Sequence, residues 1–231
     1  MKKVHIIGLL LLIVTASYTA QAQIQSLDGV SISPPAFNSE SSDNLNDYLL
    51  SNLEYPYGTF NQGLQGTEVV RFSVTTFGAI SNITVLNSVS KEVDREVKRV
   101  LQRTGGNWNP GTVNGKPSEM TRELSLAFVL YSYQDMLKTA NNHIQRGNKL
   151  VFEKNKPERA LEYFNKAAKL FPNESSILYM QWYCLDQLDR GTEADAVRER
   201  YEFLASQHEN KIHKNRNEVI SFVDPVTVIY P

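Results

Sequence analysis

Alternating residue types from Met120 to Leu130 constrain the fold more than any other feature of the chain. One set of alternate positions is apolar and the other is polar or small: Met120, Leu124, Leu126, Phe128 and Leu130 against Thr121, Glu123, Ser125 and Ala127. Arg122 interrupts the apolar set near its start. Because successive side chains of a strand point to opposite faces of a sheet, this pattern predicts a long strand with one buried face.

The segments before this strand predict the rest of a small sheet with helices packed on it. Residues 70–75 alternate like a half-buried strand, and a turn at Gly78 joins them to a returning strand that has either a bulge or burial on both faces. Apolar residues recur at helical spacing after Asp43, as a plausible N-cap, and again over 90–104. Residues 58–66 are expected to form a turn-rich connection. The predicted order is helix, hairpin, helix, strand.

The stretch NWNPGTVNGKP, residues 107–117, joins the second helix to the last strand. Pro110-Gly111 and Asn114-Gly115 predict two turns, because these dipeptides favour turn conformations. Trp108 follows the end of a helix, so we expect its indole to fold back over the core as a structural plug. The alternative is direct contact between Trp108 and a ligand. Lys116 is expected to be solvated.

The order of these motifs resembles the TonB C-terminal domain family, in the form common in Bacteroidota. The resemblance covers about residues 34–131, from PPAF and LNDYLLSNLEYP through GLQG, VVRFSV, ITVLNSV and VDREVKRVLQ to WNPG, NGKP and LSLAFVL. Each motif alone is weak, but their conjunction in this order is specific. The resemblance implies structural roles for the motif residues Tyr55, Pro56, Gly66, Gly78, Trp108, Pro110, Gly111, Gly115 and Lys116.

The resemblance also implies a function in the cell envelope. Members of this family capture an extended peptide of an outer-membrane receptor, or of another envelope partner, by strand addition linked to TonB-dependent transport. An edge strand suits this task because its unpaired N–H and C=O groups accept a guest strand. The partner-binding edge strand is expected at Thr121, Arg122, Glu123, Leu124, Ser125, Leu126, Ala127 and Phe128.

The start of the chain predicts export. Residues 1–22 have a basic start, an apolar run and small residues at Ala20 and Ala22, as a cleavable signal peptide does. The apolar run is shorter than the roughly 20 residues that a membrane-spanning helix needs. We therefore expect a periplasmic protein that meets the membrane only indirectly, with residues 23–42 as a linker or lead-in. The alternative is a retained anchor, which would make the protein a TonB-type energy transducer.

Residues 133–207 predict an all-α region that resembles a tetratricopeptide repeat. The repeat's signature spacing is met at Gly147, Ala160, Phe164, Ala167 and Pro172. One extra residue lies in the turn between the first two helices, and a second hairpin, over 175–207, matches the repeat poorly. Because so few repeats lack independent stability, the helices are expected to lean on the first domain. An alternative function is a scaffold or adaptor that binds its partner through these helices.

Composition excludes several function classes. The formal charge of −1 argues against a nucleic-acid partner. The single cysteine, Cys184, lies on an apolar helix face, and the 4 histidines lack metal-ligand spacing. No nucleophile motif occurs, so we expect no enzyme activity, no metal and no cofactor. The predicted fold class is α+β: a small antiparallel sheet with packed helices over 43–131, followed by the all-α hairpin region.

The last residues, 208–231, are expected to form a polar tether and a strand-like tail. Residues 218–230 are rich in valine, isoleucine and aromatic residues, which favours a strand. Pro225 restricts such a strand to an edge position because proline has no N–H. The strand over 119–130 is the edge best suited to accept it. We therefore expect the tail to occupy or compete for the partner-binding site.

Overall fold

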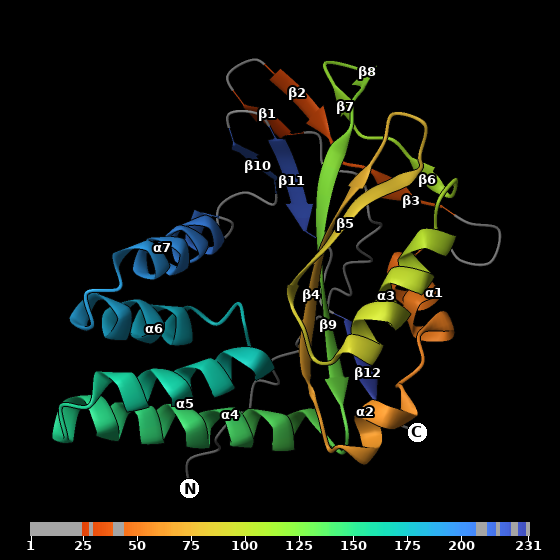
Figure 1. Cartoon of the computed structure of the whole chain (residues 1–231). Helices are drawn as coiled ribbons and strands as arrows, with labels where there is room; N and C mark the ends of the chain where they lie inside the picture. The colour runs from red at the N-terminus through yellow and green to blue at the C-terminus, as the bar shows by residue number, and fades with distance from the viewer. Residues whose placement is uncertain are drawn as a thin grey trace, which may run out of the picture.

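The computed structural model describes residues 25–27, 30–38, 44–206, 212–215, 218–222 and 226–229. Within these residues the main sheet has six strands in the order β10-β11-β9-β4-β5, and β12 also pairs with β9. The strands are β4 (Gly66–Val74), β5 (Ile80–Asn87), β9 (Met120–Val129), β10 (Ile212–Asn215), β11 (Glu218–Phe222) and β12 (Val226–Ile229). Figure 1 shows β9 and β4 side by side along the middle of the molecule. The predicted α+β fold is confirmed.

Three helices cover one face of the sheet: α1 (Leu45–Asn52), α2 (Tyr57–Asn61) and α3 (Lys91–Arg103). The side chain of Asn44 caps α1 by accepting from the N–H of Asn46, one residue after the predicted cap. Ser90 caps α3 in the same way, accepting from the N–H of Val93. α2 was not predicted, because its sequence, YGTFN, is short and begins directly after a proline.

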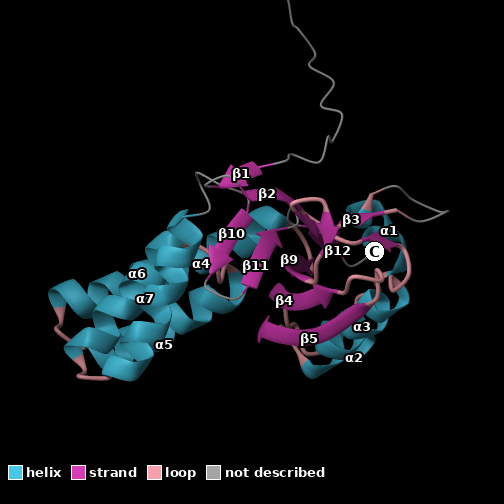
Figure 2. Cartoon of the chain, turned by 90° about the horizontal axis from the view of Figure 1, so that it is seen from above, coloured by secondary structure: helices cyan, strands magenta, loops and turns pink. Residues whose placement is uncertain are grey.

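The helical region packs on the opposite face of the sheet (Figure 2). It consists of α4 (Tyr133–Asn148), a π-helical turn η1 (Lys149–Glu153), α5 (Pro157–Leu170), α6 (Ser175–Gln187) and α7 (Gly191–Ser206). Ala127 and Val129 of β9 contact Met136, Ala140 and Leu170 in a small apolar cluster. The turn between the first two helices, where the repeat pattern predicts one extra residue, begins with η1. The helices do lean on the first domain.

The helical region also serves as a crossover between two strands of one sheet. β9 ends at Val129, and β11 pairs with β9 in parallel. Parallel neighbours need a crossover connection from one end of the sheet back to the other. Here α4, α5, α6 and α7 lie in that connection, so they belong to the same folding unit as the sheet. None of the described helices is long and apolar enough to cross a membrane.

The lead-in differs from the predicted linker. Its described residues form β1 (Gln25–Leu27), β2 (Val30–Ser33) and β3 (Ala36–Phe37). β2 pairs with β7 (Thr112–Val113), which also pairs with β8 (Lys116–Pro117), and β3 pairs with β6 (Trp108–Asn109). Ile32 and Phe37 are buried where these strands pair, so apolar contacts hold the segment in place. The composition of the segment did not predict these contacts. The signal-peptide prediction for residues 1–22 lies outside the described residues.

Trp108 lies in the core between the sheet and the lead-in. Its ring meets Phe37 and Phe72 edge-on, with centroid distances of 5.4 and 5.7 Å. Its indole Nε1–H donates to Thr104 Oγ1 at 3.0 Å, which satisfies the polar end of the buried ring. Gly78, at φ +74°, lies so close to the Trp108 carbonyl that a Cβ would clash with it. These contacts are those expected of a structural plug.

Candidate partner-binding strand

β9 is paired along both of its edges. β4 runs antiparallel to it along its length, from the pair Gly66–Phe128 to the pair Val74–Met120. On the other edge lie β11 and β12, both parallel to β9. β9 is therefore an interior strand of the complete sheet. It is an edge strand only when the tail strands are left out, in the set β5-β4-β9. The tail does pair with the strand where we expected it.

Two segments of the tail pair with β9. β11 pairs with Thr121, Arg122 and Glu123, and β12 pairs with Leu126 through Val129. The register shifts by one residue between the two segments, because Phe222 pairs with Glu123 and Val226 pairs with Leu126, four positions apart on the tail and three on β9. Residues 223–225 lie outside the described residues. In the sequence this stretch contains Pro225, which has no N–H to give to a ladder.

The apolar face of β9 forms the centre of the domain core. Leu124, Leu126 and Phe128 are fully buried against α1 and α3 residues of the same cluster. Tyr55 of the YP motif meets the Phe128 ring edge-on at 5.6 Å, and its hydroxyl donates to the Leu64 carbonyl at 2.6 Å. Burial raises the pKa of Tyr55 to about 12, so it stays a neutral donor at physiological pH.

The opposite face of β9 carries a charge cluster around a buried glutamate. Glu123 is 1% exposed and accepts from Arg71 Nη2 on β4 at 3.1 Å. Arg200 on α7 donates to both Glu123 oxygens, with Nη1 3.0 Å from Oε2. Arg200 also donates to Asn173 at 2.7 Å. Bidentate pairs of this kind fix geometry as well as supply energy. The cluster ties the last helix to the middle of β9.

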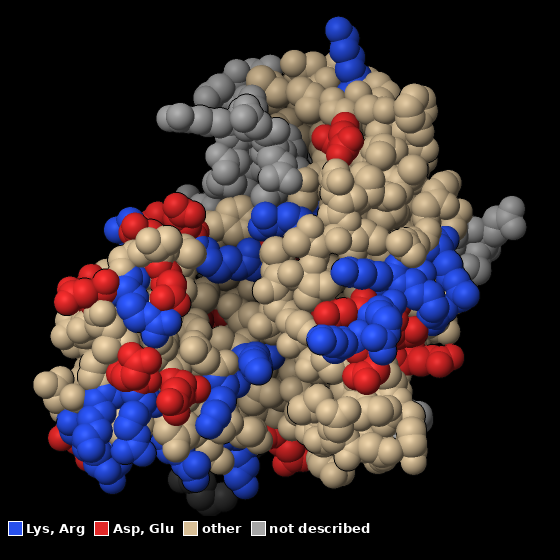
Figure 3. All heavy atoms as spheres, in the orientation of Figure 1, with Lys and Arg blue, Asp and Glu red and all other residues tan. Residues whose placement is uncertain are grey.

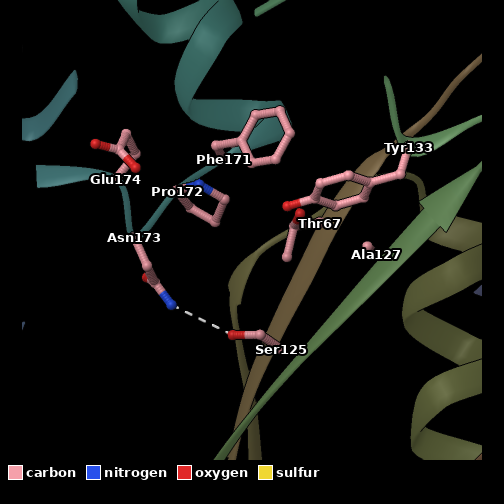
Figure 4. Close-up of a pocket in the computed structure, with 8 residues that line it drawn as sticks. All are labelled: Thr67, Ser125, Ala127, Tyr133, Phe171, Pro172, Asn173 and Glu174. Carbon is pink, nitrogen blue, oxygen red and sulfur yellow. Dashed lines mark hydrogen bonds between the residues drawn. The ribbon is translucent and has the colours of Figure 1, made fainter. Parts of the chain in front are cut away.

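A hollow of about 430 Å³ lies between the sheet and the helical region (Figure 4). The sheet contributes Thr67, Ser125 and Ala127, and α4 contributes Tyr133. The connection between α5 and α6 contributes Phe171, Pro172, Asn173 and Glu174. Asn173 Nδ2 donates to Ser125 Oγ at 3.3 Å across it. The side chains of Ser125 and Ala127 therefore face the helices. If a guest strand pairs with these two residues, its backbone bonds to theirs and its side chains at the paired positions also face the helices.

The remaining predicted residues have structural surroundings. The motif glycines Gly66, Gly78 and Gly115 all have positive φ, and Lys116 is exposed as expected. In the helical region the inner positions of the repeat signature are fully buried: Ala160, Phe164 and Ala167. A Cβ at Gly147 would meet the Phe164 ring, so the two helices approach closely there. Pro172 lines the hollow.

Three contributors to the region around β9 were missed from the sequence: Asn173, Arg200 and Val228. Asn173 lies in the turn between α5 and α6, and Arg200 lies on α7. Polar residues at such places are usually solvated. Val228 of β12 was included in the strand-like tail but not assigned to the core, although it is 6% exposed there. Only its β-branched character pointed to a buried strand position.

No group of His, Cys, Asp or Glu in the described ranges could hold a metal ion. Cys184 is buried, and burial raises the pKa of its thiol to about 11, which keeps it protonated and unreactive. Figure 3 shows acidic and basic side chains mixed over α3 and the helical region on the displayed face. Such a mixture differs from the continuous basic surface that binds nucleic acids.

A family model matches the part of the chain that contains β9. Residues 51–130 match the family model of the Gram-negative bacterial TonB protein C-terminal. No curated protein and no solved structure matches the chain. The TonB C-terminal match runs from the end of α1 to the residue after β9, so it contains α3, β4, β5 and β9 but not the helical region or the tail.

The TonB C-terminal match carries a coarse statement about function. This family is a non-enzymatic protein-interaction domain, and its domains are periplasmic in Gram-negative bacteria. The match supports a TonB-type domain of an envelope protein with a protein partner. The Bacteroidota form and the tetratricopeptide likeness of residues 133–207 stay predictions.

Proposed function

We propose that the TonB C-terminal domain of this chain captures an extended peptide of an outer-membrane receptor, or of another envelope partner, by strand addition at β9. The observation that carries the proposal is the pairing of β11 and β12 with β9, because it places strands on the same edge that a guest would use. Main-chain hydrogen bonds supply the affinity in such complexes, and pockets for alternate side chains supply the selectivity.

The other edge of the sheet is a poorer acceptor. β5 pairs with β4 through a register that shifts twice, between Val69 and Val70 and between Arg71 and Ser73. Asn82 of β5 has a φ of +52°, which breaks the regular strand conformation. Bulges of this kind protect an edge from further pairing. β9 has no such irregularity in its ladder with β4, so we assign the guest strand to β9.

Strand addition is tested with the full chain and synthetic peptides. The probes are peptides that cover the periplasmic N-terminal segments of TonB-dependent receptors from the same bacterium. We expect one or more to bind, and we then compare two N-methylated forms, methylated at odd or at even positions. Because alternate N–H groups of a strand point to one side, one form should lose binding by about 10-fold or more and the other should keep it. Equal binding by both forms would contradict strand addition.

Periplasmic location is part of the same proposal and has its own measurement. The basic start, short apolar run and small residues before Gln23 support a cleaved export signal. We expect the protein isolated from cells to begin near Gln23 when its N-terminus is sequenced. A protein that begins at Met1 would instead support a retained anchor and the energy-transducer alternative.

A second candidate function is an adaptor that binds through the helical region, and one observation favours it. α4, η1, α6 and α7 enclose a hollow of about 410 Å³ next to Phe152 and Tyr179, which are 68% and 48% exposed. Exposed aromatic residues at a concave surface are typical of protein-binding sites. If the adaptor function holds, Tyr179→Ala should weaken partner binding, whereas the strand-addition function predicts no change. Deletion of the helices is a poor test, since it would uncover Ala127 and Val129.

A further inference from the structure

We propose that the C-terminal tail is a built-in competitor of the partner peptide, and that its backbone path is a template for that peptide. The tail occupies the outer edge of β9 over residues 121–123 and 126–129, which is the edge assigned to the guest. A guest strand can pair there only after the tail has left. This inference rests on the proposed function and specifies both its regulation and its ligand.

The register shift in the tail makes displacement possible. The described tail residues pair with seven residues of β9, but the register shifts by one between Phe222 and Val226. A guest strand without proline could pair along the whole edge in a single register and would have an N–H at every position, which the tail lacks at Pro225. The tail is therefore a weaker occupant per residue than a regular guest, and it gains its advantage from being attached to the same chain.

Val228 defines the side chain that the guest should carry. It is 6% exposed and belongs to the core cluster that contains Leu49 of α1 and Phe128 of β9. β12 lies against α1 as well as against β9. A guest that replaces β12 must refill this position, or the core would keep a void. We infer that the partner segment runs parallel to β9 and presents a β-branched apolar residue opposite Phe128.

The helical region connects β9 to the tail and is anchored close to this edge. Arg200 on α7 is held against Glu123, the β9 residue that stands opposite Phe222 of the tail. α7 ends at Ser206, six residues after that anchor, and β11, the first tail strand that pairs with β9, begins at Glu218. A short connection keeps the effective concentration of the tail high. The anchor explains how two short strands can hold the edge.

Competition sets the size of the expected effect. When only a fraction of molecules has an open edge, the apparent affinity for a guest falls by that fraction. A tail docked in about 90–99% of molecules would weaken guest binding by about 10- to 100-fold. Releasing the tail should raise the apparent affinity for the guest by that factor. Locking the tail in place should remove guest binding almost completely.

The first experiment releases the tail in the full chain with Val228→Asp, because a carboxylate is costly in the apolar core. Leu86→Asp on β5 is the matched control, since it places the same charge on the opposite edge strand at a residue that is 44% exposed. The probe is a fluorescent peptide with the sequence of residues 218–230 from which Pro225 is omitted. We expect it to bind Val228→Asp about 10- to 100-fold more tightly than the wild type or the control.

A second experiment locks the tail and does not depend on how Val228→Asp folds. Ala127 and Thr227 are register partners in the β9–β12 ladder, and Ala127 lines the hollow of Figure 4, so there is room for sulfur. In the double variant Ala127→Cys, Thr227→Cys the two cysteines should form a disulfide under mild oxidation. The native Cys184 is buried and should not interfere. The oxidised protein should lose probe binding, and reduction should restore it.

The outcomes separate this inference from the proposed function. Equal probe affinity for wild type, Val228→Asp and Leu86→Asp would overturn the competitor, as would failure of the two cysteines to cross-link or unchanged binding after cross-linking. If the probe behaves as expected but no receptor segment binds Val228→Asp, the competitor stands and the assignment of the partner is wrong. If receptor segments bind the released and the locked protein equally, strand addition occurs elsewhere.

Discussion

Replacing Trp108 with alanine should lower the free energy of unfolding by about 3–5 kcal/mol, the usual cost of removing a large buried aromatic side chain. Trp108 is 5% exposed and contacts Phe37 from the lead-in and Phe72 from β4. Its loss would therefore loosen the lead-in as well as leave a cavity in the core. Urea unfolding followed by far-ultraviolet circular dichroism measures the change.

Two controls separate packing from other effects. Trp108→Phe keeps a ring in the core but loses the hydrogen bond to Thr104, so we expect a smaller loss, with about 1 kcal/mol from that bond. Tyr131→Ala removes an aromatic ring that is 78% exposed and should be close to neutral. If Trp108→Ala unfolds at the same urea concentration as the wild type, the plug is wrong and a ligand contact becomes the better explanation.

Replacing Glu68 with glutamine should change the pH dependence of stability. Glu68 is fully buried on β4, and desolvation raises the pKa of its carboxyl to about 8, although the Val89 N–H donates to it at 2.9 Å. Asp94 raises this pKa further, while Lys98 opposes the rise. The native state thus favours the protonated carboxyl, whereas the unfolded chain ionises it above about pH 4.5.

The sign of the effect follows from proton binding. Between about pH 4.5 and 8 the native state holds a proton that the unfolded state releases, so the wild type loses stability as the pH rises through this range. Glutamine has a similar shape and no such proton. We expect the free energy of unfolding of Glu68→Gln to rise relative to that of the wild type by about 3 kcal/mol between pH 4.5 and 7. Well above pH 8 this difference should grow no further.

Urea unfolding at several pH values tests this prediction. Glu119→Gln changes an exposed glutamate in the same sheet region and should leave the pH profile of the wild type unaltered. Parallel profiles for Glu68→Gln and the wild type would show that Glu68 ionises normally in the folded protein.

The sequence was sufficient for the regular elements of the domain. β9 and α3 were predictable because each has one continuous apolar face, and Ser90 marks the start of the helix. The tail was predictable as a strand from its valine and isoleucine content, and as a partner of β9 because an exposed strand of that kind needs a neighbour. These are properties of single segments and of their simplest pairing.

What failed to be predicted depends on contacts between distant segments. The lead-in forms strands because Phe37 meets Trp108, a residue 71 positions later. β10 lies within a stretch that looks polar, and pairing with β11 stabilises it. The Glu123–Arg200 pair joins residues that each resemble ordinary solvated side chains. The parallel direction of the tail follows from the path of four helices, which no local pattern encodes.

The long separation between β9 and the tail has a consequence for the newly made chain. β9 pairs with residues about 100 positions later, and proteins are synthesised from the N-terminus at about 5–20 residues per second. Once β9 has been made, its outer edge therefore waits about 5–20 s for its own tail. During that interval the nascent domain has an open edge strand, which is the state most exposed to aggregation and to capture by chaperones.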